Sequence, residues 1–334
     1  MSTTHLRQSS IDLDSVDRPF DNIINFRDVG QTINHLLGRR VVKEGLLFRS
    51  ARLDDASERD KRRLIDEYHI ATIIDLRSST EHHMATSKRL SDTAAAAPTT
   101  TPNNSDNIHL IDLPHTQRRL ISLTGKAFER TLLWRLDWWN LLKVIAFAAS
   151  GYRNDAVIIV GQQVMSPRGL IGLGIDTLDS SVSEMREIFE VFAGGDAQRE
   201  SKQSTTSNGG GSTDPSTTFI SPPYPYPVIV HCTQGKDRTG LIILLLLLLT
   251  GAVPQDAIRA DYVLSEGELV IEVAERMKEI RLLGLSEDYT KCPEGFTAQI
   301  CAHLEAKYGG VEGYLKQAGV DEEMLERVKK NLLA

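Results

Sequence analysis

The segment of the sequence with the clearest chemical potential is His231–Gly240, which reads HCTQGKDRTG. Five residues separate Cys232 from Arg238, and apolar stretches stand on both sides of the segment. A loop between a strand and a helix can curl so that its N–H groups point inward, and the helix N-terminus adds positive potential. The planar guanidinium of Arg238 can bind two oxygens of one phosphate. The spacing therefore predicts a phosphate-binding loop.

The same positive field favours the thiolate form of Cys232, which is the nucleophilic form of cysteine. We expect this thiolate to attack phosphorus and form a phosphocysteine, which water then hydrolyses. Arg238 and the loop amides would stabilise the charge on the phosphoryl oxygens, so neither a metal nor another cofactor is required. The other residues expected to line the phosphate are Thr233, Gln234, Gly235, Lys236, Asp237 and Thr239. Thr239 is also expected to donate a hydrogen bond to the sulfur.

Departure of the product requires a general acid that protonates the leaving oxygen. Asp237, inside the loop, is the first candidate. Asp75 is the second, because it ends the apolar run Ala71–Leu76 and the carboxyl ends of parallel strands face the active edge of a sheet. His231 precedes the nucleophile and is expected to orient the loop through hydrogen bonds.

Other kinds of protein also place a cysteine or a glycine-lysine pair in such a loop. The nucleotide-binding Walker loop is excluded, because Asp237 follows Gly235-Lys236 and Val230 stands where that motif requires a glycine. A cysteine-based sulfurtransferase or arsenate reductase remains an alternative, as does a non-catalytic phosphate-binding scaffold. Arg238 followed by Thr239 favours phosphoryl chemistry, and a mere binder does not need a thiol.

Composition narrows the class of protein. The 334 residues carry a net charge of -7, which argues against nucleic acid as a partner and does not indicate a membrane surface. The three cysteines, Cys232, Cys292 and Cys301, are too few for a disulfide framework and suit a reducing, cytoplasmic location, and the latter two are interpreted as structural or incidental. The apolar run Leu241–Leu249 is too short to span a bilayer and is interpreted as a buried core helix.

The apolar patterns predict alternating strands and helices, and therefore an α/β fold with a central, mainly parallel sheet flanked by helices. Strands are expected at 71–76, 108–113 and 226–230. Helices are expected after a capping box at Ser57 and Asp60, along the face of 185–192, over 239–249 and through the C-terminal third, where Leu325, Val328 and Leu332 recur.

The domain organisation is expected to be a flexible tail at 1–19 and one phosphatase domain at 20–334. Two stretches near 85–107 and 194–226 are rich in Ser, Thr, Gly, Pro and Asn and are interpreted as low-complexity insertions. Residues 127–149 include Trp134, Trp138 and Trp139; core packing is favoured there over a helical lid that touches lipid. Arg27, Arg49 and Arg77 are expected to add positive potential or to form structural ion pairs.

The HC-x-x-G-K-D-R-T-G loop resembles the signature of an atypical tyrosine and lipid phosphatase family of bacteria and fungi, within the cysteine-dependent tyrosine phosphatase superfamily. Further blocks resemble this family in the right order, from about residue 20 to the end of the chain. These blocks are 25–28 (NFRD), 45–51 (GLLFRSA), 74–78 (IDLRS), 260–262 (ADY) and 308–315 (YGGVEGYL).

The resemblance implies a protein tyrosine phosphatase fold, with Cys232 as nucleophile and Arg238 as phosphate ligand. The loop pair of the family matches Lys236 and Asp237, and its lysine is associated with relaxed specificity that includes phosphoinositides. The implied substrates are phosphotyrosine, with phosphoserine and phosphothreonine as further candidates, and phosphoinositide monoesters. Ordinary tyrosine phosphatases have a Trp-Pro-Asp acid loop, whereas the expected strand 108–113 is followed here by Pro114-His115.

Overall fold

The structure is a computed structural model that describes residues 20–96, 107–194 and 225–334. Within these residues the centre is a five-stranded sheet in the order β1-β2-β5-β3-β4, in which only the β1–β2 pair is antiparallel. The strands are β1 (Arg27–Asp28), β2 (Leu47–Ser50), β3 (Thr72–Asp75), β4 (Gln117–Leu120) and β5 (Val228–His231). The predicted α/β class with a mainly parallel sheet is therefore confirmed.

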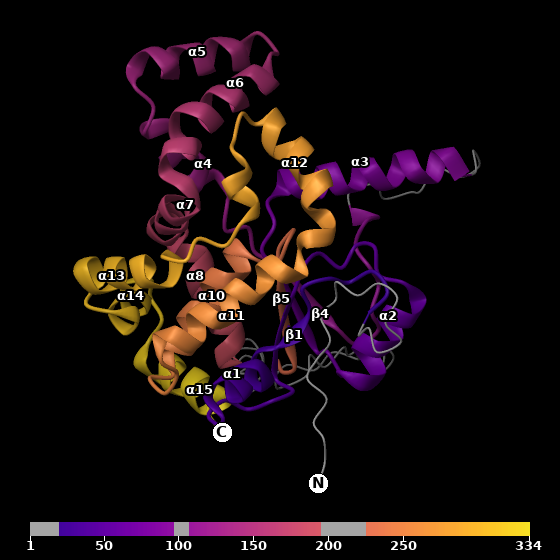
Figure 1. Cartoon of the computed structure of the whole chain (residues 1–334), viewed down its shortest axis with the longest axis vertical. Coiled ribbons are helices and arrows are strands. Elements are labelled where there is room, and N and C mark those ends of the chain that lie inside the picture. Colours follow the sequence, from indigo (N-terminus) through magenta and orange to yellow (C-terminus); the bar gives the residue numbers. More distant parts are fainter. Residues whose placement is uncertain (1–19, 97–106, 195–224) are drawn as a thin grey trace, which may run out of the picture.

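Helices surround this sheet, as Figure 1 shows. The N-terminal half contains α1 (Val29–Leu37), α2 (Glu58–Arg62), α3 (Ser79–Ala96), α4 (Lys126–Trp134), α5 (Trp138–Ala149), α6 (Arg153–Val160), α7 (Ser166–Ser180) and α8 (Val182–Ala193). The C-terminal part contains α10 (Asp237–Leu249), α11 (Gln255–Glu268), α12 (Val273–Leu282), α13 (Phe296–Tyr308), α14 (Val311–Gln317) and α15 (Glu322–Leu332). Short turns of helix include η1 (Arg63–Glu67), η3 (Gly161–Met165) and η5 (Glu287–Thr290).

Side chains of the buried strands alternate between the two faces of the sheet, and each face packs into a separate hydrophobic core. Val228 and Val230 of β5 enter the larger core with α8 and α10, whereas Ile229 points to the opposite face and packs with Phe48 and Ile73. Successive side chains of a strand point to opposite faces, so a strand that is apolar throughout is buried on both sides.

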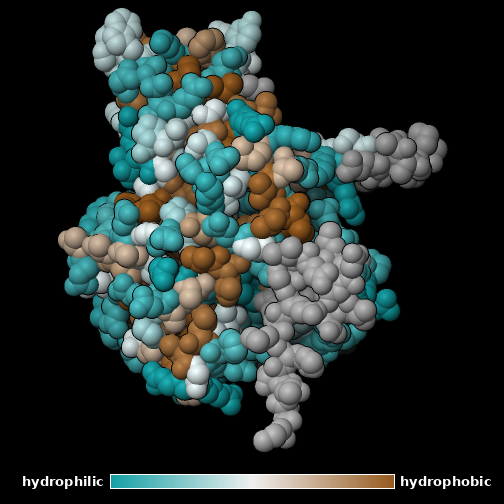
Figure 2. All heavy atoms as spheres, viewed as in Figure 1, coloured by the Kyte–Doolittle hydropathy of each residue, from teal (hydrophilic) through white to brown (hydrophobic). Residues whose placement is uncertain are grey.

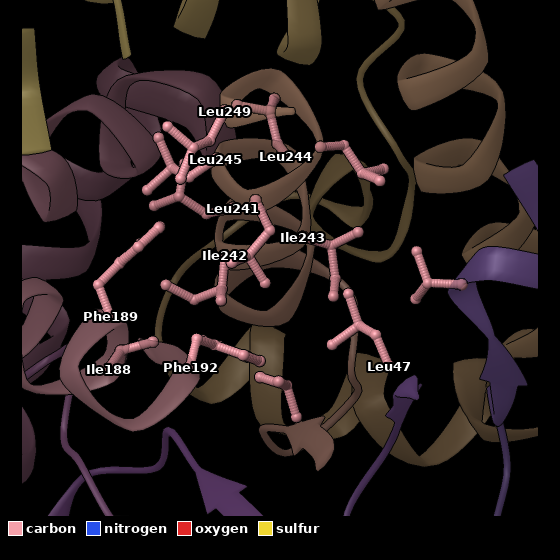
Figure 3. Packing of buried hydrophobic residues seen from close by; sticks show 14 of the residues in the cluster. Leu47, Ile188, Phe189, Phe192, Leu241, Ile242, Ile243, Leu244, Leu245 and Leu249 are labelled. Atoms are coloured by element: carbon pink, nitrogen blue, oxygen red, sulfur yellow. The ribbon is translucent and has the colours of Figure 1, made fainter. Parts of the chain in front are cut away.

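Helix α10 fills the larger core. Figure 3 shows its side chains between Phe189 and Phe192 of α8 and Leu47 of β2. It begins at Asp237, two residues before the predicted start, and nearly all of its apolar side chains are buried. The prediction of a core helix here is confirmed, as are the capping box at Ser57 and the buried faces of α8 and α15.

Two predictions of local structure are wrong. Residues 108–113 form no strand; Ile111 and Leu113 are buried against the sheet from a loop, and the strand beside β3 is the polar edge strand β4. The apolar residues of 108–113 are therefore explained by burial of a loop and not by pairing within the sheet. Residues 85–96 continue helix α3 instead of starting a loop, in keeping with the high helix propensity of an alanine-rich sequence. The remainder of that stretch, 195–224 and the tail 1–19 lie outside the described residues.

The three central strands end side by side. Ser50 of β2 and Asp75 of β3 are each paired with His231 of β5. Loops that follow parallel strands meet at the carboxyl edge of the sheet. This register therefore brings Cys232 close to the segments that follow Ser50 and Asp75.

Candidate active site

The loop from Cys232 to Arg238 is held by groups that bind its carbonyl oxygens from outside. The donors come from the N-terminal segment of the chain: Arg52 N to Thr233 O (3.1 Å), Asn25 Nδ2 to Gln234 O (2.9 Å) and Arg49 Nη2 to Gly235 O (2.7 Å). With three successive carbonyls turned outward, the N–H groups of the loop are left to face an anion. The conformation of the predicted anion-binding loop is therefore fixed by backbone and side-chain groups far away in the sequence.

Position 235 requires glycine because its backbone has a positive φ and because there is no room for a side chain. Its φ is +65°, and a Cβ atom there would lie 2.0 Å from the carbonyl oxygen of Ser50. Gly240 has a similar role at the start of α10, where a Cβ would lie 2.8 Å from the ring of Tyr262. Both glycines allow close approach of the loop to its neighbours.

A buried cluster of charges supports the loop from behind. Asp261 binds Arg27 Nε at 2.7 Å and Arg49 Nη1 at 2.5 Å, and all three side chains are buried. Burial opposes ionisation of Asp261, yet the two arginines hold its pKa below the ordinary value. Two cations with one anion leave one net positive charge behind the phosphate loop. Arg27 and Arg49 therefore form structural ion pairs and also contribute positive potential.

Arg238 is oriented by a residue that the sequence analysis missed. Its Nη1 and Nη2 atoms each lie 2.6 Å from a carboxylate oxygen of Glu81, and the hydroxyl of Thr233 also donates to Glu81. Burial opposes ionisation of Glu81, but Arg238 holds its pKa well below the ordinary value. Glu81 also accepts a hydrogen bond from Ser78 N. The sequence Ser78-Ser-Thr-Glu81 therefore has the spacing of a capping box, and this local role does not indicate that Glu81 also contacts Arg238.

Cys232, the predicted nucleophile, directly follows β5 and is only 3% exposed. All three cysteines are free thiols. Burial raises the pKa of Cys292 to about 12, which makes it a poor nucleophile and suits a structural role. The predicted hydrogen bond from Thr239 to the sulfur is not formed: the hydroxyl of Thr239 is buried without a partner among the described residues.

Asp237 occupies the first turn of α10 at the end of the loop. Its side chain is 34% exposed, and Oδ1 accepts a hydrogen bond from the hydroxyl of Tyr262 at 3.1 Å. Partial exposure lets a proton reach the carboxyl group from solvent. The position suits the first-choice general acid, whose role stays a prediction.

Asp75 is placed differently from what a general acid requires. It is fully buried and is bound by Arg77, with Nη2 at 2.7 Å, while Arg77 also binds Asp54 at 2.5 Å. Burial opposes ionisation, but His231 and Arg77 hold the pKa of Asp75 far below its ordinary value. A carboxylate that remains ionised does not donate a proton, so the geometry argues against Asp75 as the general acid and assigns Arg77 to a structural ion pair.

His231 has the environment of an orienting residue. Its Nδ1 lies 3.3 Å from the carbonyl oxygen of Cys232, and its Nε2 lies 3.5 Å from Asp75. Burial lowers the pKa of His231 to about 4, so the ring is neutral at neutral pH. A neutral ring next to the nucleophile agrees with the predicted role of holding the loop.

The charge of Lys236 is directed to backbone carbonyl oxygens near η5 and to Asp237, whose Oδ1 lies 3.8 Å from the ammonium nitrogen. Its ammonium group is fully buried and donates to the carbonyl oxygens of Tyr289 (3.1 Å) and Lys291 (2.7 Å), at and beyond the end of η5. In this conformation Lys236 contributes its backbone to the phosphate loop and its side chain to the anchoring of η5. The prediction that the lysine side chain binds substrate phosphate is not met by this geometry.

Comparisons with known proteins are consistent with a phosphate-binding active site. The sequence matches the tyrosine phosphatase family over residues 18–157 and 163–334. The chain belongs to this family. It is 36% identical over 116 residues to a tyrosine-protein phosphatase of Nostoc commune, a stretch that covers 31% of this chain and 38% of that protein. It is 29% identical over 122 residues to the triple specificity protein phosphatase PtpB of Mycobacterium tuberculosis, which covers 32% of this chain and 44% of PtpB. The matched stretches thus span less than half of either relative.

Proposed function

We propose that this chain is a cysteine-dependent phosphoric monoester hydrolase that acts on phosphotyrosine, with phosphoserine and phosphothreonine as further substrates, and on phosphoinositides. The observation that supports this most is the loop after β5, in which a thiol and Arg238 share a cradle whose carbonyl oxygens are turned away. Such a cradle selects an anion and places the sulfur beneath it. Loss of the thiol is the direct test.

The reaction proceeds in two displacements. The thiolate of Cys232 forms the S–P bond as the P–O bond to the leaving group breaks, and the leaving oxygen takes the proton of Asp237. The carboxylate of Asp237 then accepts a proton from water, whose oxygen attacks phosphorus and releases the thiolate and phosphate. Arg238 stabilises the charge on the phosphoryl oxygens in both steps.

Two features bear on the choice of substrate. PtpB bears the name triple specificity phosphatase, which supports testing more than one class of phosphate ester on this chain. The buried position of Lys236 means that a second phosphate of an inositol head group would need this side chain to leave η5. We therefore expect phosphotyrosine to be the better substrate of the conformation described.

The experiment is phosphate release from phosphotyrosine peptides and from short-chain phosphoinositides, with Cys232→Ser as the control. Wild-type protein should release phosphate, and rapid acid quenching should leave labelled phosphate on the protein. Cys232→Ser should bind phosphate esters without turnover. Turnover that persists in Cys232→Ser would refute the cysteine mechanism. A folded, reduced wild type that binds phosphate esters but releases no phosphate would favour a phosphate-binding scaffold. Reduction of arsenate or transfer of sulfur by such a protein would instead indicate an arsenate reductase or a sulfurtransferase.

The role of Asp237 is tested by changing the leaving group. Asp237→Asn should slow hydrolysis of phosphotyrosine by about 10²–10⁴-fold, because its phenolate needs a proton. Hydrolysis of an aryl phosphate with a far more acidic phenol should be affected much less. Equal losses on both substrates would show that Asp237 acts in some other way.

A further inference from the structure

The lobe formed by α4, α5 and α6 exposes apolar side chains that a folded domain normally buries. Trp134 is 78% exposed, Trp138 is 59% and Trp139 is 61%, although the sequence analysis favoured core packing for them. The rings of Trp138 and Trp139 lie 3.7 Å apart, centre to centre. Adjacent, solvent-exposed tryptophans on one small lobe indicate a surface for contact with another phase or molecule.

Helix α5 presents its apolar surface outward. Only Asn140 and Lys143 are polar in this helix, and Val144 is its only buried residue among those described. The remaining exposed large apolar side chains of the lobe are Leu142, Ile145, Phe147, Tyr152 and Val157. Figure 1 shows the lobe standing clear of the sheet, at the end of the molecule away from α1 and α15, and Figure 2 shows apolar side chains among polar ones on it.

The charge of the lobe differs in sign from that of the whole chain. The chain has a net charge of -7, but residues 126–160 carry five basic and three acidic side chains. These are Lys126, Arg130, Arg135, Lys143 and Arg153 against Glu129, Asp137 and Asp155. The local excess of positive charge lies beside the exposed tryptophans and complements an anionic surface.

The lobe is attached firmly to the rim of the active site. Arg238 Nη1 lies 3.3 Å from the hydroxyl of Thr124, two residues before α4. Beyond α6, the hydroxyl of Tyr289 in η5 donates to the carbonyl oxygen of Met165 in η3. Phe128 and Leu132 of α4 pack against Val164 and Leu173 in a small core of their own. A contact made at the exposed tryptophans is therefore made at a defined position relative to the phosphate loop.

We propose that the exposed face of α5, with Trp134 and Trp138–Trp139, docks on an anionic lipid membrane surface. Tryptophan is favoured at the boundary between lipid and water, and basic side chains beside it are attracted to anionic head groups. A second copy of the chain fits less well, because a symmetric dimer would bring the two basic lobes together. This docking is independent of which phosphate ester is the substrate.

The adjoining helical run Asp155–Ser180 is long and apolar enough to cross a membrane by length and composition alone. It is nevertheless part of the folded domain, because Leu178 is buried in the main core and Asp176 is bound by Arg135 and Arg168. The proposed contact is accordingly with the membrane surface, through α5.

The test uses the full chain with Cys232→Ser, so that binding is measured without turnover. The three tryptophans of the chain all lie on this lobe, so intrinsic tryptophan fluorescence reports the lobe alone. Vesicles of phosphatidylcholine with about 30% phosphatidylserine should shift the emission to the blue and sediment the protein. Pure phosphatidylcholine vesicles should do so at least about tenfold more weakly.

A double substitution, Trp138→Ala with Trp139→Ala, should lower the affinity for the anionic vesicles by at least about tenfold. Leu36→Ala on α1, which removes exposed apolar surface at the other end of the molecule, should leave it unchanged. The same tryptophan substitutions in protein with intact Cys232 should keep hydrolysis of a soluble phosphate ester, which shows that the fold survives. Two results would overturn the proposal. One is that the protein binds neither kind of vesicle, and the other is that a concentration-dependent dimer accounts for the blue shift without lipid.

Discussion

Arg238 and Glu81 are joined through both Nη atoms and both carboxylate oxygens, each contact being 2.6 Å long. The pair holds the guanidinium in one orientation before a substrate arrives and leaves its Nε–H free of Glu81. Groups that stabilise a transition state act best when they need no rearrangement. Glu81, supplied by α3 rather than by the loop, therefore positions Arg238 for its proposed role as phosphate ligand.

Glu81→Gln should reduce kcat/KM for a soluble aryl phosphate by about 10–100-fold, because a guanidinium without its carboxylate partner samples other orientations. Steady-state kinetics measure this, and circular dichroism shows whether the protein is folded. Glu58→Gln breaks an exposed ion pair with Lys61 and should change kcat/KM by less than about twofold. A Glu81→Gln enzyme as fast as wild type would remove Glu81 from the site.

Gly235→Ala and Gly251→Ala form a matched pair. Both glycines have φ of +65°, but a Cβ at Gly251 meets nothing within 4 Å, whereas one at Gly235 meets Ser50 at 2.0 Å. Gly251→Ala should cost about 1–2 kcal/mol of unfolding free energy, from backbone strain alone. Gly235→Ala should cost more and also abolish most turnover, since the loop must move. Urea denaturation and phosphate release distinguish the two effects; equal behaviour of the variants would contradict the close approach.

Stability should fall with acid between pH 6.5 and 4 because of His231. Burial lowers the pKa of the folded-state ring to about 4 from 6.5, so in this window the unfolded chain binds a proton that the folded chain does not. The free energy of unfolding should drop across the window by up to about 3 kcal/mol from this residue. Burial lowers the pKa of His82 and His109 too, which acts in the same direction.

The measurement is urea unfolding at several pH values for wild type and His231→Asn. The variant should show a shallower dependence on pH between 6.5 and 4, whatever its absolute stability. Identical slopes for the two proteins would mean that His231 is protonated in the folded state.

Lys236→Met should destabilise the fold by about 2–4 kcal/mol, because it leaves the carbonyl oxygens of Tyr289 and Lys291 without their buried donor. Lys43 donates to two carbonyl oxygens near the C-terminus in the same way, but near solvent. Lys43→Met should cost less than about 1 kcal/mol, since water replaces the ammonium. Thermal unfolding compares them. If Lys236→Met were as stable as wild type, its ammonium would have to lie elsewhere, such as toward substrate.

Much of the fold and the loop could be predicted because the relevant signals are local. The β-branched run before Cys232, the apolar run after it and the spacing of Arg238 all lie within about twenty residues of one another. Periodicity and turn chemistry act over such distances. The strand at β4 was missed for the opposite reason: its polar residues pair with β3 at the sheet edge, and no local apolar pattern marks it.

The partners of the loop could not be predicted from local patterns. Glu81 has the spacing of a helix cap, and its contact with Arg238 is visible only once α3 and α10 are placed together. The ammonium group of Lys236 forms its hydrogen bonds at η5, which lies more than fifty residues later in the sequence. The exposed tryptophans mislead for a related reason, since apolar residues are usually buried and only the packing of α4 to α7 shows that these are not.

The contacts that hold the phosphate loop also determine at what stage of synthesis of the chain the site can form. Arg49 positions Gly235 while bound to Asp261, and the ammonium of Lys236 requires the backbone at Lys291. A nascent chain that has just completed the loop has the donors of Asn25, Arg49 and Arg52 but still lacks Asp261 and the carbonyl oxygen of Lys291. Contacts over such separations form slowly. We expect the loop to reach its final conformation only after the chain has been made past Lys291, so the site is completed late in synthesis.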